Sequence, residues 1–190
     1  MPKKALKGFA NFGYVPLTAN TTAAYTPGSR VPVTGAQSCT AGDNRQDYEV
    51  RADDGVYDSG SEYQNTQLVV TLAEATLADI AALAGADYDE TSKELTEAEL
   101  DAAPEVALNF SGLRADGGKR LFLYYCCKLL SYKADLNTRG ANNDISAYQL
   151  TFKCYGRVYD GFVRTTKDVD AVGGVVDLTW LNTVDAMPGT

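Results

Sequence analysis

The chain has 190 residues, of which 45% are hydrophobic and 22% charged, proportions typical of one globular domain with a single core. Its formal net charge is −8 and it contains no histidine. These values disfavour a protein that grips nucleic acid through a basic face and an enzyme that uses the commonest general base at neutral pH. We predict a single domain over residues 1–190, with residues 1–10 and 185–190 as flexible ends.

The N-terminal sequence MPKKALKGFANFGYVPL has no continuous apolar segment of the kind found in secretory signals. The longest apolar run, 121–127, is far shorter than the roughly 18 residues of a membrane helix. We therefore expect a protein that is made in a cytoplasm and has no membrane partner.

Two extended segments, 44–52 and 62–72, are predicted on either side of a stretch rich in Asp, Gly and Ser. The dipeptide Asp54-Gly55 is a strong turn signal. Only the second segment has an apolar face, formed by Leu68, Val70 and Leu72. The pattern predicts a hairpin, 44–66, that projects beyond its own core. A long polar connection of this kind is commonly a mobile loop, but it can also reach a neighbouring subunit.

Residues 76–85 carry the signals of one short helix. Thr76 and Asp79 form a capping pair, and Gly85 is placed to end the helix. The apolar stripe predicted to face a sheet consists of Leu77, Ile80, Ala81 and Ala84.

The segment 96–103 fits either a helix or a loop. Thr96 and Glu99 form a weaker capping pair, the apolar stripe is thin, and Pro104 follows soon after.

The most apolar part of the chain, 120–132, is predicted to be a long strand that is covered on both faces. One expected face carries Phe122, Tyr124, Cys126, Leu130 and Tyr132, and the other carries Leu121, Leu123, Tyr125, Cys127 and Leu129. The polar segment 133–144 leads to a partner strand over 147–159. Its expected core face consists of Tyr148, Leu150, Phe152, Cys154 and Val158.

The four cysteines, Cys39, Cys126, Cys127 and Cys154, show no metal-ligand spacing. Neighbours in a strand point to opposite faces, so Cys126 and Cys127 are not expected to share a metal ion or a disulfide. In a reducing compartment all four are predicted to be free, buried side chains.

No motif for chemistry is present. The acidic pairs Asp53 with Asp54 and Asp87 with Asp89 lack the spacing of a calcium-binding loop. No serine lies in a nucleophile-elbow motif. We expect no catalytic residue, no metal site, no cofactor and no enzymatic activity.

Five segments of the chain occur in a recognisable order: KKALKGFANFGYVPLT, RADDGVYDSG, VVTLAEATLADIAALAGADYD, APEVALNFSGLRADGGKRLFLYYCCKL and FKCYGRVYDG. Together they resemble the major tail protein family of long-tailed bacteriophages, in its phi13-like branch, from about residue 3 to residue 183. Arg51 and Asp54 depart from the tyrosine and asparagine common in that family, and Glu105 and Asn109 also depart from its pattern.

The resemblance implies a tail-tube fold, mainly β, with a β-sandwich or partial barrel, one flanking helix at about 76–85 and the projecting hairpin 44–66. It also implies hexameric rings that stack into a conduit in the virion. The implied partners are further copies of the chain and the tape measure, tail terminator and distal tail proteins. Double-stranded DNA would pass without specific binding, and an acidic protein suits this task because a basic wall would hold phosphates back.

The candidate functional residues lie in the hairpin. Inter-subunit contacts are expected at Asp53, Asp54, Gly55, Tyr57, Asp58 and Tyr63. Asp47 and Glu49, on the mixed-charge side of the strand 44–51, are candidates for the wall of the channel. The alternative places Asp47 and Glu49 on an ordinary outer surface or in a subunit contact.

A different class of protein also fits the composition. A monomeric β-sandwich could bind carbohydrate or a host surface, with Tyr57, Tyr63 and Trp180 as stacking platforms. The tube subunit of a related injection system is a further alternative.

Overall fold

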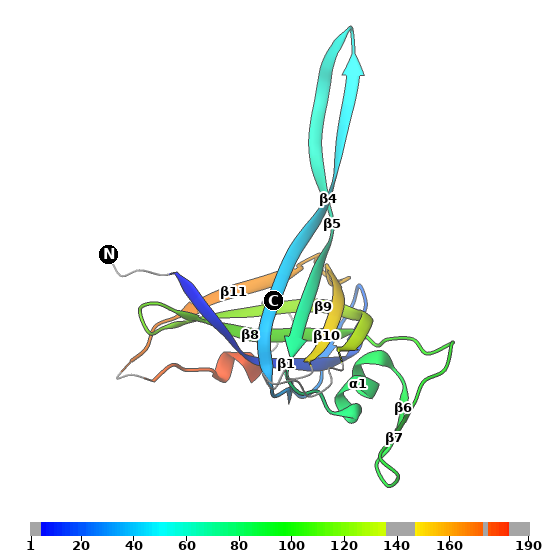
Figure 1. Ribbon diagram of the computed structural model, residues 1–190. Coiled ribbons are helices and arrows are strands. Elements are labelled where there is room, and N and C mark those ends of the chain that lie inside the picture. Colours follow the sequence, from blue (N-terminus) through cyan, green and yellow to red (C-terminus); the bar gives the residue numbers. More distant parts are fainter. Residues whose placement is uncertain (1–4, 136–146, 173–174, 183–190) are drawn as a thin grey trace.

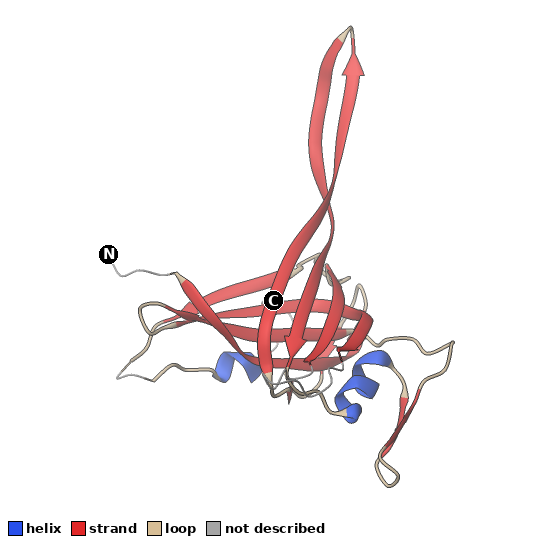
Figure 2. Cartoon of the chain, in the orientation of Figure 1, coloured by secondary structure: helices blue, strands red, loops and turns tan. Residues whose placement is uncertain are grey.

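The computed structural model describes residues 5–135, 147–172 and 175–182. Within these ranges the chain is mainly β, with one α-helix against the body and a long two-stranded hairpin that rises away from it (Figures 1 and 2). The expected fold class is therefore confirmed. Most of the polar segment 133–144 and the tail 185–190 lie outside the described residues.

One large sheet forms the body. Its strands run in the order β2-β1-β8-β9-β10-β5-β4, with β3 also paired to β1 and β11 to β9, while β6 and β7 form a separate small hairpin. The strands are β1 (Leu6–Asn20), β2 (Tyr25–Pro27), β3 (Val31–Pro32), β4 (Ala36–Ala52), β5 (Gly55–Leu72), β6 (Asp87–Asp89), β7 (Glu94–Thr96), β8 (Val106–Arg114), β9 (Lys119–Asp135), β10 (Ala147–Tyr155) and β11 (Arg164–Val169).

The sheet rolls around its main core. Phe12 of β1 and Phe152 of β10 are separated in the sheet by β8 and β9, yet their ring centroids lie 6.4 Å apart. Leu68, Val70 and Leu72 of β5 join the same buried cluster. Of the two expected architectures, this single rolled sheet corresponds to the partial barrel.

The opposite face of β9 has a smaller core. Leu123 and Tyr125 pack there with Val15, Tyr25 and Ala107, and Trp180 lies against them. Trp180 belongs to a 3-10 helix, η1 (Thr179–Asn182). The prediction that both faces of this strand are covered is confirmed from Leu121 to Cys127, and along Leu123 and Tyr125 the cover comes from the chain itself. It is wrong further along, where Lys128 and Leu130 are exposed.

The predicted faces of β9 are wrong for Cys127 and Leu129, whereas Tyr125 and Tyr132 lie on the faces predicted for them. Leu108 pairs with Tyr124 but Val106 pairs with Cys127, so β9 carries one extra residue there. A bulge of one residue reverses the faces of the side chains that follow, until a second bulge restores them. Cys127 and Leu129 consequently join the main core. A second register shift, opposite Thr151 and Phe152, leaves Leu130 58% exposed.

The same bulge explains a disulfide that the sequence did not predict. Cys127 lies directly opposite Cys154 of β10, with a Cα–Cα distance of 4.0 Å, and the two are bonded. Cys39 and Cys126 are free. The prediction that all four cysteines are free is therefore wrong. A smaller correction applies to Val158, which is 52% exposed because β10 ends at Tyr155.

The helix α1 (Leu77–Ala84) confirms the local signals. The backbone N–H of Asp79 donates to Thr76 Oγ1 at 3.1 Å, and Gly85 ends the helix with a φ of 78°. The buried side chains are Ile80, Ala81 and Leu83, whereas Leu77 is 42% exposed. The buried face of the helix is thus rotated from the predicted apolar stripe towards Leu83.

The segment 96–103 is a loop. Its first residue, Thr96, ends β7, and no helix follows before β8.

Candidate interaction hairpin

The hairpin is a continuous antiparallel ladder. β4 and β5 pair from Ala36 with Leu72 to Ala52 with Gly55. The polar connection expected to be a loop between 52 and 62 is therefore strand on its β5 side. β10 pairs with β5 only between Thr66 and Leu72. Residues 44–65, which we call the ribbon, have no third strand beside them among the described residues (Figure 1).

The tip of the ribbon is a tight turn at Asp53 and Asp54. Both residues have positive φ angles, 50° and 59°, and Ala52 pairs with Gly55. Two central residues in the left-handed region define a type I′ turn, whose twist matches that of the flanking strands. Asp tolerates this region better than most residues. The predicted turn is therefore shifted by one residue, and Gly55 begins β5.

One side of the ribbon carries Tyr48 and Val50. Tyr48 lies opposite Gly60, and Val50 lies opposite Asp58. A Cβ on Gly60 would lie 2.7 Å from the Tyr48 ring, so the ring packs directly over that glycine. Tyr48 remains 42% exposed and Val50 48% exposed. We call this side the Tyr48 face.

The other side carries Asp47, Glu49 and Arg51, with Val56 opposite Arg51. Asp47 lies opposite Ser61, and Glu49 lies opposite Ser59. Glu49 also accepts a hydrogen bond of 2.5 Å from Arg51 Nε. We call this side the Asp47 face. The structure therefore brings the two proposed channel residues together on one side of the ribbon, away from Tyr48 and Val50.

The ribbon is acidic. Between residues 44 and 63 the sequence has six carboxylates and two arginines. The carboxylates are Asp47, Glu49, Asp53, Asp54, Asp58 and Glu62, and the arginines are Arg45 and Arg51. This part of the chain thus repels copies of itself unless a partner supplies compensating charge.

The residues proposed as inter-subunit contacts divide between the two ends of the ribbon. Asp53, Asp54 and Gly55 form the tip, and Tyr57 and Asp58 follow on β5, with Tyr57 78% exposed. Tyr63 lies at the base, where its hydroxyl donates to the Cys154 carbonyl at 3.2 Å.

Three exposed apolar residues of the ribbon were not among the predicted contacts: Tyr48, Val50 and Val56. Alternation of apolar and charged residues along 46–51 is the signal that could have identified the first two.

Charged and hydroxyl side chains gather at the base of the ribbon. Thr66, which is fully buried, donates to Asp43 Oδ1 at 2.6 Å. Arg164 of β11 donates to both oxygens of Asp43, at 3.1 and 3.0 Å. The hydrogen bond from Thr66 and the nearby Arg164 guanidinium hold the pKa of Asp43 below its ordinary value. Asp43 is therefore ionised at neutral pH.

The described residues contain no group of three or more His, Cys, Asp or Glu side chains that could hold a metal ion. Burial raises the pKa of the free Cys39 and Cys126 thiols to about 12, which keeps both protonated. No helix of the described residues is long and apolar enough to cross a membrane.

The three aromatic residues considered as stacking platforms lie in different settings. Tyr57 is exposed near the tip of the ribbon, Tyr63 is hydrogen-bonded at its base, and Trp180 packs against the smaller core.

Comparison with known proteins identifies no family. No family model matches the chain, and no curated protein matches it. Among solved structures, a chain from the sheath–tube complex of an extracellular contractile injection system, in its extended state, is 10% identical, with a TM-score of 0.46 over 84% of this chain and 90% of that one. The tube-terminating cap of the anti-feeding prophage is 10% identical, with a TM-score of 0.44 over 83% of this chain and 88% of that one. A type six secretion system protein is also 10% identical, with a TM-score of 0.43 over 88% of this chain and 90% of that one. Likenesses this distant assign neither a family nor a function to the chain.

Proposed function

We propose that the chain is a structural subunit that assembles with copies of itself into a tube. The observation that carries the proposal is the ribbon, a paired hairpin over residues 44–65 that has little core of its own and no third strand beside it within the described part of the chain. A two-stranded hairpin in water is at best marginally stable unless another strand or surface packs against it. A second copy of the chain supplies that surface in an assembly.

The side chains of the ribbon support this role. Tyr48, Val50, Val56 and Tyr57 are all more than two-fifths exposed. Exposed apolar side chains gathered on one projecting element favour contact with a protein partner. The sequence resemblance to major tail proteins favours another copy of the chain as that partner.

At the finer level, we propose stacked hexameric rings in the tail tube of a virion, through which double-stranded DNA passes without specific binding. Contacts with neighbouring subunits would involve Asp53, Asp54, Gly55, Tyr57 and Asp58. Tape measure, tail terminator and distal tail proteins would complete the assembly.

We further propose that Asp47 and Glu49 line the channel. If the Tyr48 face packs on a neighbour, the opposite face remains open to the lumen. Carboxylates on that wall would repel phosphates and leave DNA free to slide.

A ribbon-less variant tests the proposal. Arg45 and Tyr63 pair directly, so residues 46–62 can be replaced by Asn-Gly, which closes this pair with a type I′ turn. A matched control shortens the other hairpin: Asp89 pairs with Glu94, and residues 90–93 are replaced by Asn-Gly. Negative-stain electron microscopy and sedimentation velocity would report assembly, and thermal melting would report folding.

We expect rings or tubes from the parent chain and from the control, and folded monomers from the ribbon-less variant. A parent chain that stays monomeric at every concentration, and in material prepared from virions, would refute the proposal.

A further inference from the structure

We propose that four side chains at the base of the ribbon form a clasp that fixes the direction in which the ribbon leaves the body. The clasp consists of Asp43 on β4, Tyr63 and Thr66 on β5, and Arg164 on β11. Its structural role stands on the contacts described below, and its consequence for assembly rests on the proposed function.

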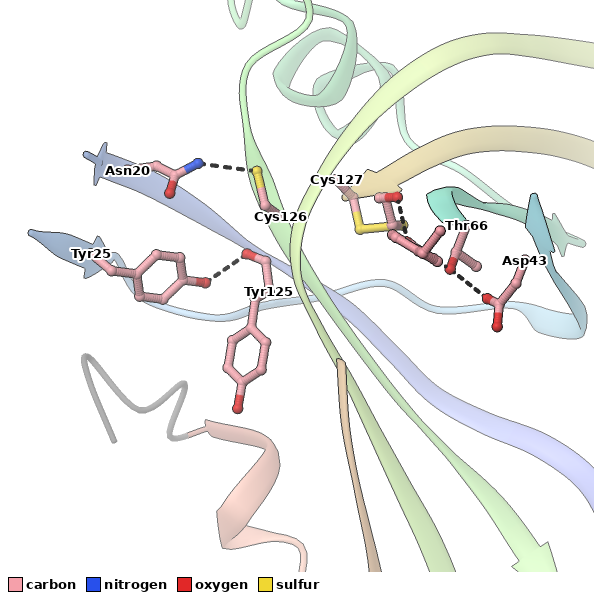
Figure 3. Close-up of a disulfide and its surroundings, with 9 residues drawn as sticks. Asn20, Tyr25, Asp43, Thr66, Tyr125, Cys126 and Cys127 are labelled. Carbon is pink, nitrogen blue, oxygen red and sulfur yellow. Dashed lines mark hydrogen bonds between the residues drawn. A yellow bond between two sulfur atoms is a disulfide. The ribbon is translucent and has the colours of Figure 1, made fainter. Parts of the chain in front are cut away.

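Two residues of the clasp, Asp43 and Thr66, lie on the last row of the sheet before the ribbon continues alone. Asp43 pairs with Thr66, Thr66 with Cys154, and Cys154 with Cys127. This row crosses β4, β5, β10 and β9, and the disulfide joins β10 and β9, the two strands of the row that lie farthest from β4 (Figure 3). The row is therefore the fixed end from which the ribbon extends.

The hydrogen bonds of the clasp form one continuous chain. Thr66 uses its only hydroxyl proton on Asp43, so its oxygen is left to accept from the Tyr63 hydroxyl, 3.0 Å away. Tyr63 shares its proton with the carbonyl of Cys154, at 3.2 Å. Each donor has an acceptor, and the chain links β10 through β5 to β4.

Arg164 connects this series of hydrogen bonds to β11, a strand that is not a neighbour of β4 in the sheet. β11 pairs only with the first half of β9. From there Arg164 reaches Asp43 with two parallel hydrogen bonds, between residues 121 positions apart in sequence. A two-point contact between planar groups fixes orientation as well as distance. The free edge of β4 is thereby held to β11 at the base of the ribbon.

A bulge in β5 between Thr66 and Tyr63, two residues of the clasp, explains why bracing is needed. Asn44 pairs with Asn65, but Arg45 pairs with Tyr63, so β5 carries one extra residue at Gln64. Bulges bend a strand and increase its local twist. The side chains of Asn44 and Asn65 hydrogen-bond at 2.8 Å. Without the hydrogen bonds of the clasp across this bend, the ribbon could change its direction relative to the body.

The expected swing is large enough to measure. Ser59 lies seven residues beyond Thr66 along β5, which corresponds to roughly 24 Å of strand. A rotation of roughly 20°, comparable to the twist between neighbouring strands, would move Ser59 by roughly 8 Å. If the chain assembles as proposed, a clasped ribbon reaches its neighbour already oriented and loses less conformational freedom on docking.

Pulsed electron paramagnetic resonance tests the clasp. Spin-labelled unnatural amino acids replace Ser59 on the ribbon and Ala115, which is exposed in the turn between β8 and β9. The labelled chain is diluted with unlabelled chain so that each distance is intramolecular. Thr66→Val keeps the shape of the side chain and removes both of its hydroxyl contacts, and Arg164→Gln removes the bidentate pair. Arg120→Gln is the matched control, because Arg120 makes a similar pair with Asp168 between β9 and β11, at 2.5 and 2.9 Å.

We expect one narrow distance distribution in the parent and the control, and distributions broadened by roughly 8 Å in Thr66→Val and Arg164→Gln. If Thr66→Val fails to fold, Arg164→Gln decides, since this arginine side chain is 44% exposed. Distributions as narrow as the parent's in the folded variants would overturn the clasp. The measurement does not depend on assembly. If the variants keep narrow distance distributions and the parent chain forms tubes, the clasp alone is refuted. If the variants show broadened distance distributions and the parent chain never assembles, the tube alone is refuted.

Discussion

Removing the disulfide between β9 and β10 should destabilise the fold by an amount that follows from the loop it closes. Cys127 and Cys154 are 27 positions apart. In the chain-entropy model, a cross-link of this span lowers the entropy of the unfolded chain enough to contribute about 3.5 kcal/mol at 25 °C. Replacing both cysteines, in Cys127→Ala with Cys154→Ala, should therefore lower the free energy of unfolding by about that amount.

Urea unfolding with and without a reductant provides the assay. Reduction should weaken the parent by about 3.5 kcal/mol and leave the double variant unchanged. Cys126→Ala is the matched control, because Cys126 is buried and free, and the control should keep the full response to reductant. Alkylation of the denatured parent should modify two thiols before reduction, Cys39 and Cys126, and all four cysteines after it. Four reactive thiols before reduction, or stability that reductant does not change, would contradict the reasoning.

Three further variants test other contacts. Arg157→Met removes a buried guanidinium that lies 4.2 Å from the Tyr125 ring centroid and pairs with Asp160 at 2.7 Å. We expect the free energy of unfolding in urea to fall by about 3–5 kcal/mol, as for other broken buried pairs. A decrease below about 1 kcal/mol would show that the pair is weakly coupled. Tyr48→Ser should leave the melting temperature of the body nearly unchanged, because Tyr48 belongs to neither hydrophobic core, while it lowers the yield of tubes in electron microscopy; unchanged tubes would remove the Tyr48 face from the interface. Asp47→Lys with Glu49→Lys should still form tubes but slow genome ejection more at low salt than at high salt, and normal ejection would place these two residues away from the channel.

Local signals predicted α1 correctly because the residues that start and stop it lie within the segment. Thr76 caps the first turn with its own hydroxyl, and Gly85 supplies the left-handed conformation that ends the last turn. The length of the ribbon was underestimated for the opposite reason. Residues 55–62 contain Gly, Ser and Asp, which have low β-propensity. They are held in a strand by β4, partly through the Tyr48 ring over Gly60.

Two features depended on register, which alternation of residue types does not reveal. One extra residue between Tyr124 and Cys127 reversed the faces of β9 and placed Cys127 opposite Cys154. The clasp depends on residues distant in sequence, since Asp43 and Arg164 meet only after β11 has packed along β9. The sequence indicated where the ribbon is and that it is polar, but not what holds its base.

The open edges of the ribbon have a consequence for the chain before it meets its partners. Unpaired strand edges are templates for indiscriminate pairing, the route by which exposed hairpins form aggregates. The ribbon's six carboxylates against two arginines give like charge to any two ribbons that approach edge to edge. This repulsion acts over about 8 Å at physiological ionic strength and shortens as salt rises. The acidity of the ribbon thus keeps newly made chains apart, while a contact with a differently charged surface on the body of a neighbour remains allowed.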